Sequence, residues 1–170
     1  FLNIIGRSKA MQDVFSLIRR VSKTDANILI LGESGTGKEL GARAIHRLSP
    51  RGEGSFVPVH TTAIPADLLE STLFGHVKGA FTGAVSARKG LFEAAHNGTL
   101  FLDEVGTISP ETQTKLLRVI QEREIRRVGS VEAKAVDTRL VAATNTDLWQ
   151  EVQKGNLRED LYYTLHVSTI

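Results

Sequence analysis

Residues 28–39 read ILILGESGTGKE, and this stretch decides the fold of the chain. Its first four residues are apolar and rich in β-branched side chains, and they end at Gly32, which is typical of a buried strand that runs into a turn. The residues from Lys38 to Arg47 predict a helix. A glycine-rich turn that ends in Gly-Lys, between a strand and a helix, matches the phosphate-binding loop pattern.

The chemistry of this loop depends on its glycines and its lysine. Glycines let the chain bend tightly, so that backbone N–H groups surround phosphate oxygens, while the Lys38 ammonium and the positive end of the helix add charge. A plain glycine-rich turn is the alternative, and the flanking strand and helix argue against it. Glu39 stands where the pattern usually has a Ser or Thr that binds Mg²⁺, so magnesium must be held mainly from elsewhere. The residues predicted to bind the nucleotide are Gly32, Glu33, Ser34, Gly35, Thr36, Gly37, Lys38 and Glu39.

A second motif supplies carboxylates. Residues 99–104 read TLFLDE, so an apolar strand ends in Asp103 and Glu104, where ligands of α/β sheets bind. Asp103 is predicted to hold Mg²⁺, directly or through water, and Glu104 to orient and polarise an attacking water. An acidic helix cap is the alternative for this pair. Together with the glycine-rich loop, the two carboxylates predict one ATP-hydrolysing site.

The rest of the chain alternates predicted helices with predicted strands. Helices are expected after the capping residue Ser8 and over residues 66–73, 90–96, 110–122 and 148–154, and further strands over residues 56–59 and 139–143. This order predicts an α/β fold with a parallel sheet flanked by helices, in which the strands at 28–31 and 139–143 are central. Three glycines predict a loop over residues 75–87 that leaves the body of the domain.

The composition excludes several classes of protein. With 170 residues and 41% hydrophobic content, the chain is expected to form one domain with a buried core. Its 21 basic and 19 acidic residues nearly cancel, which argues against strong attraction to nucleic acid or anionic lipid. Without cysteine, and with scattered histidines, no disulfide or structural metal site is expected. The lack of a long apolar run or signal peptide favours a cytoplasmic protein with no membrane partner, and the start without Met favours a piece of a longer protein.

Residues 79–84 read GAFTGA, the signature of the sigma-54-dependent transcriptional activators, or bacterial enhancer-binding proteins. GESGTGKEL, LLESTLFGH, GTLFLDEVG, TKLLRVIQE, VAATN and REDLYY also resemble the central AAA+ ATPase domain of that family, along nearly the whole chain. The resemblance implies the α/β part of an AAA+ P-loop NTPase over residues 1–170, with the helical lid outside this chain. It also implies ATP and Mg²⁺ as cofactors, a ring that is expected to be a hexamer, and DNA binding through a domain outside this chain. The implied activity is ATP-driven remodelling of sigma-54 RNA polymerase holoenzyme, which promotes open-complex formation.

The resemblance also implies roles for single residues. The segment expected to contact sigma-54 is Gly79, Ala80, Phe81, Thr82, Gly83 and Ala84, with Phe81 and Thr82 at its tip. Asn145 is similar to the first sensor residue, Arg158 to an arginine finger that reaches the ATP of the neighbouring subunit in trans, and Ile5 and Gly6 to residues that pack against adenine. The alternatives are a turn-forming Asn, a solvated surface Arg and ordinary core packing.

Two positions depart from the family pattern. His60 stands where the family usually has an Asn that couples the catalytic Glu to the phosphates, and Thr164 stands where a second Arg is usual. His60 can still donate a hydrogen bond, whereas Thr is too short and uncharged to replace Arg. These departures favour, as an alternative, a hydrolysis-impaired, nucleotide-sensitive regulatory scaffold of the same fold. An AAA+ chaperone or helicase loader would explain the ATP motifs but not the GAFTGA segment. The remaining histidines are expected to be surface or packing residues: His46, His76, His96 and His166.

Overall fold

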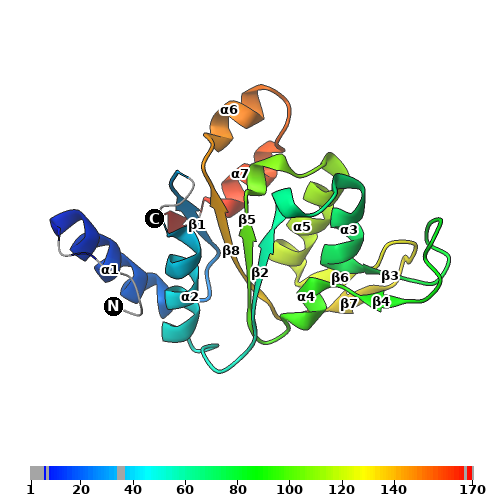
Figure 1. Cartoon of the computed structure of the whole chain (residues 1–170), viewed down its shortest axis with the longest axis horizontal. Helices are drawn as coiled ribbons and strands as arrows, with labels where there is room; N and C mark the ends of the chain where they lie inside the picture. The colour runs from blue at the N-terminus through cyan, green and yellow to red at the C-terminus, as the bar shows by residue number, and fades with distance from the viewer. Residues whose placement is uncertain (1–5, 7, 34–36, 167, 170) are drawn as a thin grey trace.

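A parallel five-stranded sheet, in the order β2–β5–β8–β1–β9, forms the centre of the molecule (Figure 1). The computed structural model describes residue 6, residues 8–33, residues 37–166 and the backbone of residues 168 and 169. The strands of the sheet are β1 (Ile28–Leu31), β2 (Phe56–His60), β5 (Thr99–Asp103), β8 (Arg139–Thr144) and β9 (Ser168–Thr169). All neighbours in it are parallel, so the carboxyl ends of the strands lie at one edge. The predicted α/β fold is confirmed, with β8 central and β1 beside it.

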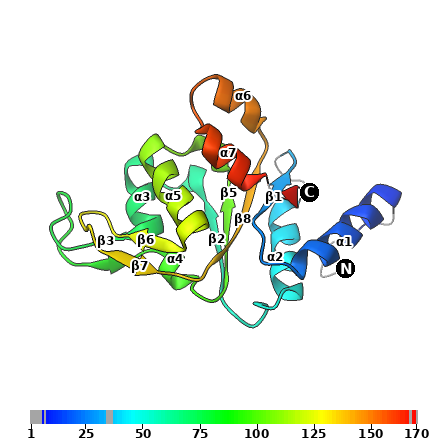
Figure 2. The ribbon, with the colours of Figure 1, turned by 180° about the vertical axis from the view of Figure 1, so that it is seen from behind.

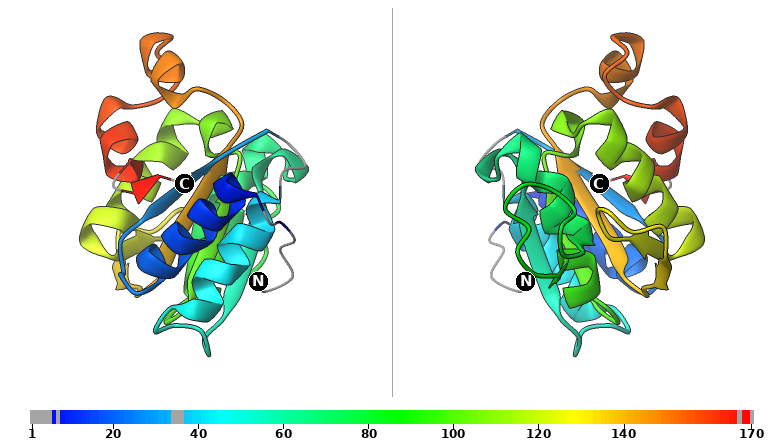
Figure 3. Two further views of the ribbon diagram at one scale, coloured as in Figure 1. Left: turned by 90° about the vertical axis from the view of Figure 1, so that its left-hand side faces the viewer. Right: turned by 90° about the vertical axis from the view of Figure 1, so that its right-hand side faces the viewer.

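Helices cover both faces of the sheet because the strand side chains alternate between two apolar cores. Ile28 and Ile30 pack in one core with α1 and α2, whereas Leu29 packs in the other with α3, α5 and α7. The helices are α1 (Lys9–Ser22), α2 (Lys38–Leu48), α3 (Ala66–Phe74), α4 (Leu91–Ala94), α5 (Pro110–Glu122), α6 (Leu148–Gln153) and α7 (Glu159–Leu165). Figure 3 shows α1 and α2 on one side of the sheet and α5 with α7 on the other. A run of apolar strand residues is stable here because each face has its own helical cover.

Local capping explains where several of the helices begin. The Ser8 side chain accepts a hydrogen bond from the N–H of Met11, and Ser109 caps α5 in the same way, with Pro110 in its first turn. The helices predicted after Ser8 and over residues 66–73, 110–122 and 148–154 are confirmed. The helix predicted over residues 90–96 is shorter, because Asn97 adopts φ 63° and turns the chain toward β5. None of the helices in the described part of the chain is long and apolar enough to cross a bilayer.

Two hairpins extend from the sheet. The first joins β3 (Gly75–His76) to β4 (Arg88–Lys89), and its loop projects at the end of the molecule opposite α1 (Figures 1 and 2). The second, β6 (Glu124–Arg126) with β7 (Ala133–Ala135), was not predicted from the sequence. Val128 joins the hairpins, because its N–H donates to Gly75 O at 2.9 Å and its carbonyl accepts from Val77 N at 3.1 Å.

One histidine is a core residue. His46 of α2 is buried, its Nε2 donates to Gly54 O at 3.0 Å, and its Nδ1 therefore accepts from the Thr99 hydroxyl at 2.8 Å. Burial lowers the pKa of His46, although the bond to Gly54 opposes this shift. The neutral ring thus joins α2 to β5, which fits the predicted packing role.

Candidate functional site

The candidate site lies at the carboxyl edge of the sheet, where the predicted residues follow or end four neighbouring strands. Gly32 follows β1, His60 and Asp103 end β2 and β5, and Asn145 follows β8. His60 is in register with Asp103, and the ends of β1 and β8 pair through Leu31. Residues from separate parts of the sequence thus meet at the edge where α/β sheets bind ligands.

The glycine-rich loop ends in a helix cap. Gly37 caps α2 with φ 85°, and a Cβ there would meet nothing closer than 4.0 Å, so the backbone conformation explains the glycine. Lys38 is 9% exposed, and its Nζ donates to Gly32 O at 2.7 Å, across the mouth of the loop. The predicted residues Ile5, Ser34, Gly35 and Thr36 lie outside the described residues. The described part therefore holds a lysine ammonium beside the N-terminus of α2, as phosphate binding requires.

Glu104 lies beside this lysine and has an unusual backbone. Its Oε1 is 3.5 Å from Lys38 Nζ, and its φ of 62° and ψ of 57° place it in the left-handed region. The hydroxyl of Thr61 holds this turn, at 2.9 Å from Glu104 O and 3.0 Å from Asp103 O, and Thr107 also donates to Glu104 O. A strained backbone that its surroundings hold in place is characteristic of functional sites. The sequence analysis missed Thr61, whose only signal is its place directly after β2.

His60 lies between two carboxylates. Its Nδ1 is 3.2 Å from Asp103 Oδ2 and its Nε2 is 3.0 Å from Glu39 Oε1. Ionised carboxylates only accept hydrogen bonds, so both contacts are hydrogen bonds only when both ring nitrogens carry hydrogen. Glu39 also forms an ion pair with Arg43, at 3.4 Å. His60 thus contacts the predicted magnesium ligand and Glu39, and no contact between His60 and Glu104 is among those of the described residues.

The environment of Asp103 fits a hard cation. Its Oδ1 is buried and has no hydrogen-bond partner among the described residues, while Oδ2 faces His60. No group of three or more His, Cys, Asp or Glu side chains in the described ranges could hold a metal alone. Mg²⁺ is usually held by one or two carboxylates together with substrate phosphates, and a single orphaned carboxylate oxygen beside a phosphate loop suits that arrangement.

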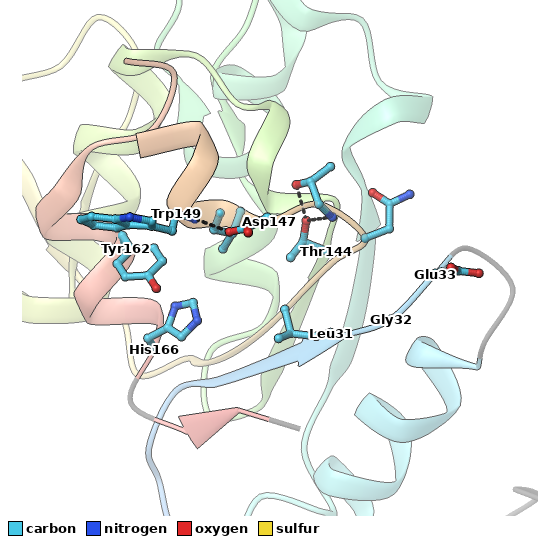
Figure 4. A pocket seen from close by; sticks show the side chains of 11 residues that line it. Leu31, Gly32, Glu33, Thr144, Asp147, Trp149, Tyr162 and His166 are labelled. Atoms are coloured by element: carbon cyan, nitrogen blue, oxygen red, sulfur yellow. Dashed lines mark hydrogen bonds between the residues drawn. The ribbon is translucent and has the colours of Figure 1, made fainter. Parts of the chain in front are cut away.

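A cavity of about 450 Å³ opens next to the loop. Figure 4 shows Trp149, Tyr162 and His166 on the side of α6 and α7, with Glu33 on the opposite side. The rings of Trp149 and Tyr162 are 5.2 Å apart, and those of Tyr162 and His166 are 4.3 Å apart. Asn145, the predicted sensor, also lines this cavity. The sequence did not predict this aromatic wall of Trp149, Tyr162 and His166, because its residues are separated in sequence and lie in or directly after two short helices.

A second, apolar cavity of about 290 Å³ adjoins the other side of the loop. Its lining combines Gly37 and Lys38 with apolar side chains of α1, β1 and α2, including Met11. Gly6 packs against Met11, because a Cβ on Gly6 would lie 2.8 Å from Met11 Cγ. The one described member of the predicted adenine-binding stretch therefore lies against a residue of this apolar cavity.

The side chain of Arg158 contacts residues of α5 and α7. Arg158 caps α7, its guanidinium forms an ion pair with Asp160 at 2.9 Å, and it contacts the Thr114 hydroxyl at 3.3 Å. The hydrogen bond from Arg158 lowers the pKa of Asp160, and the carboxylate raises the pKa of Arg158. The Thr164 hydroxyl donates to Asp160 O within α7.

The GAFTGA segment forms the projecting loop between β3 and β4. Phe81 is 38% exposed, Thr82 is exposed, and Ala84 is buried. Gly79 and Gly83 adopt φ values of 79° and 95°, and a Cβ at either would meet nothing within 4 Å. These glycines are therefore needed for backbone conformation and not for space.

Comparison with known proteins decides the family. The family model for the Sigma-54 interaction domain matches residues 4–170. The chain belongs to the sigma-54 interaction domain family. Nif-specific regulatory proteins of Herbaspirillum seropedicae and Azotobacter vinelandii are 58% and 59% identical to this sigma-54 interaction domain, over 99% and 98% of its length. It spans about a third of the length of these curated relatives, 31% and 32%.

Solved structures confirm the fold of this sigma-54 interaction domain. NtrX from Brucella abortus, in complex with ATP, matches with a TM-score of 0.92 and 39% identity, over 99% of this chain and 36% of that one. The P-loop NTPase domain of a sigma-54 transport activator from E. coli matches with a TM-score of 0.67 and 23% identity, over 98% and 96% of the two chains. The P-loop NTPase fold predicted from the sequence is thus confirmed.

Proposed function

We propose that the chain binds and hydrolyses ATP, and that hydrolysis drives remodelling of sigma-54 RNA polymerase holoenzyme toward the open promoter complex. The observation that carries this proposal is the convergence of Lys38, Asp103 and Glu104 at one edge of the sheet, from two motifs far apart in sequence. Its support from relatives is the ATP complex of NtrX and the names of the Nif-specific regulatory proteins.

The site residues divide the reaction between them. The loop from Gly32 to Gly37 and the Lys38 ammonium would bind the phosphates, and Glu104, 3.5 Å from that ammonium, would orient the attacking water beside the terminal phosphate. Asp103 would hold magnesium, which supplies positive charge to the phosphates when bound. Asn145 would contact the terminal phosphate or the water from the adjacent strand end.

The adenine base fits the apolar cavity. This cavity combines apolar walls with Gly37 and Lys38, so a base inside it leaves the phosphates at the loop. Gly6 contacts Met11 in the same wall, which is consistent with packing of the N-terminal stretch, including Ile5, against adenine.

The projecting loop would contact sigma-54. Phe81 and Thr82 are exposed on the loop between β3 and β4, which projects from the body of the domain (Figure 1). The protein would act as a ring, which we take to be a hexamer. Arg158 of one subunit would reach the ATP of its neighbour. DNA would be bound through a domain outside this chain. The exposed guanidinium of Arg158 is available for that contact once it leaves Asp160.

A hydrolysis-impaired regulatory scaffold is the second candidate. Its specific support is His60, which contacts Asp103 and Glu39 where the family usually has an Asn, and Thr164, which lacks the charge of the usual Arg. Such a chain would bind ATP and change its contacts with sigma-54 without appreciable turnover.

The test measures steady-state ATP turnover by the full-length protein, which contains this chain, as a function of protein concentration, with and without sigma-54 holoenzyme. If Arg158 acts in trans, turnover per subunit should rise with concentration, because a monomer lacks a contribution of about 10³–10⁵ in rate. Arg158→Ala should remove that rise while sedimentation shows unchanged assembly. ATP binding without turnover at any concentration would favour the scaffold instead.

A further inference from the structure

The side chain of His76 contacts three parts of the chain that meet at the base of the projecting loop. Its Nδ1 is 2.8 Å from the Ser71 hydroxyl of α3, and its Nε2 is 2.9 Å from the carbonyl of Ser86, on the returning limb of the loop. Its ring meets the ring of Phe81 edge-on, with centroids 5.0 Å apart and planes at 69°. We call Ser71, His76, Phe81 and the Ser86 carbonyl the His76 cluster.

Hydrogen-bond chemistry fixes the tautomer of the neutral ring. The Ser86 carbonyl can only accept, so Nε2 carries the hydrogen and donates to it. Nδ1 then accepts, and the Ser71 hydroxyl donates. Because His76 is only 9% exposed, losing either partner would leave a buried polar atom unpaired. The ring thus ties the returning limb of the loop to α3 by two bonds that depend on each other.

The loop above this ring is folded back on itself. Gly79 N donates to Ala84 O at 2.8 Å, and Ala84 N donates to Phe81 O at 3.0 Å. These bonds hold the segment from Gly79 to Ala84 in a tight turn, which places the Phe81 ring against His76. An edge-to-face contact of two rings is favourable beyond the area that it buries. Phe81 is therefore partly covered by His76 in this pose.

We propose that His76 is a positioning residue that holds the GAFTGA loop in this folded-back pose, so that separation of Phe81 from the His76 ring precedes its presentation to sigma-54. The inference rests on the proposed function, because it assumes that Phe81 is presented to that partner. The apparent affinity of a ligand that binds only the released loop equals its affinity for that loop multiplied by the fraction of chains in which the loop is released. Weakening the His76 cluster should therefore strengthen sigma-54 binding, which is opposite to the effect of simple damage.

The experiment compares Ser71→Ala and His76→Asn with the wild-type full chain, with Thr72→Ala as the matched control. Thr72 is the next residue of α3, and its hydroxyl donates to Leu68 O within the same helix. Amide hydrogen exchange is measured over residues 77–87, and the affinity for isolated sigma-54 is measured by titration. Loss of one hydrogen bond corresponds to roughly threefold to tenfold faster exchange in that segment, with a similar gain in affinity, and no change elsewhere in the chain.

Phe81→Leu provides a second exchange measurement that does not depend on Ser71. If the ring contact matters, His76→Asn combined with Phe81→Leu should accelerate exchange by less than the product of the single effects. Unchanged exchange over residues 77–87 in both Ser71→Ala and His76→Asn would overturn the proposal, as would equal acceleration over the whole chain. If exchange changes as expected but the wild-type chain never binds sigma-54, the proposed function fails, and the positioning role of His76 stands.

Discussion

Thr61→Val tests whether the backbone of Glu104 is set by its neighbours. Thr61 is 5% exposed, and its hydroxyl lies 3.0 Å from Asp103 O, 2.9 Å from Glu104 O and 3.1 Å from the Thr107 hydroxyl. Valine keeps the shape of the side chain and removes its hydroxyl, so Asp103 O and Glu104 O both lose this hydrogen-bond partner. The expected cost is about 1–2 kcal/mol of folding stability, because a buried hydrogen bond is lost.

For a chain of this size that cost corresponds to a fall in Tm of about 2–8 °C. The larger effect should be on catalysis, because Glu104 sits at φ 62° and loses one of the two hydroxyls that donate to its carbonyl, which lets its backbone relax. We expect kcat to fall roughly tenfold to a hundredfold, since small misplacements of a catalytic group are costly. The affinity for ATP should change little, because Thr61 does not line either cavity beside the phosphate loop.

The assay is steady-state phosphate release with ATP affinity from calorimetric titration, and Thr107→Val is the control. Thr107 also donates to Glu104 O, at 3.0 Å, but it is exposed and does not bond Asp103 O, so its loss should have a smaller effect. A Thr61→Val chain with lowered Tm and wild-type kcat would refute the reasoning, because the backbone of Glu104 would then be irrelevant to turnover.

Three further predictions follow from named side chains. Lys38→Ala should abolish ATP binding in a calorimetric titration, whereas Glu104→Gln should keep binding and lose turnover; normal turnover in Glu104→Gln would remove that residue from its assigned role. Thr82→Ala should leave phosphate release nearly intact and abolish promoter melting, and equal loss of both would contradict the separation of chemistry from partner contact. His46 has its folded pKa lowered below the ordinary 6.5, so its contribution to stability is present above pH 6.5 and is lost as pH falls through the folded pKa. Thermal unfolding between pH 7.5 and 5.5 should show this loss, and His46→Gln should flatten it; an unchanged slope in that variant would assign the loss to other groups.

Much of the fold could be predicted because its signals are local. The apolar runs of β1 and β5, the Ser8 cap of α1 and Pro110 in the first turn of α5 are visible in a few adjacent residues, and the structure places all four elements at the predicted positions. The β6–β7 hairpin could not be predicted in this way. Its strands are three residues long, all three residues of β7 are exposed, and its support comes from Val128 bonding to the distant Gly75. Helix α7 is seven residues long and is capped by Arg158, which is not a typical capping residue.

The residues of the candidate site also differ in how far a local sequence signal predicts them. Lys38 could be predicted from the glycine-rich loop pattern, and Asp103 and Glu104 because they end and follow the apolar run of β5. Thr61 carries no pattern of its own, and its role depends on the pairing of β2 with β5, which the sequence does not display. The aromatic wall of the larger cavity likewise could not be predicted, because it forms only when α6 and α7 fold against the end of β8.

The most direct test of the claim that ATP hydrolysis drives promoter opening measures promoter melting and phosphate release together, with the full-length protein, sigma-54 holoenzyme and promoter DNA. The account predicts that melting requires ATP, fails with a non-hydrolysable analogue, fails with Glu104→Gln, and does not occur with polymerase that carries another sigma factor. ATP hydrolysis at a normal rate with no melting of the sigma-54 promoter, or melting that persists in Glu104→Gln, would contradict it.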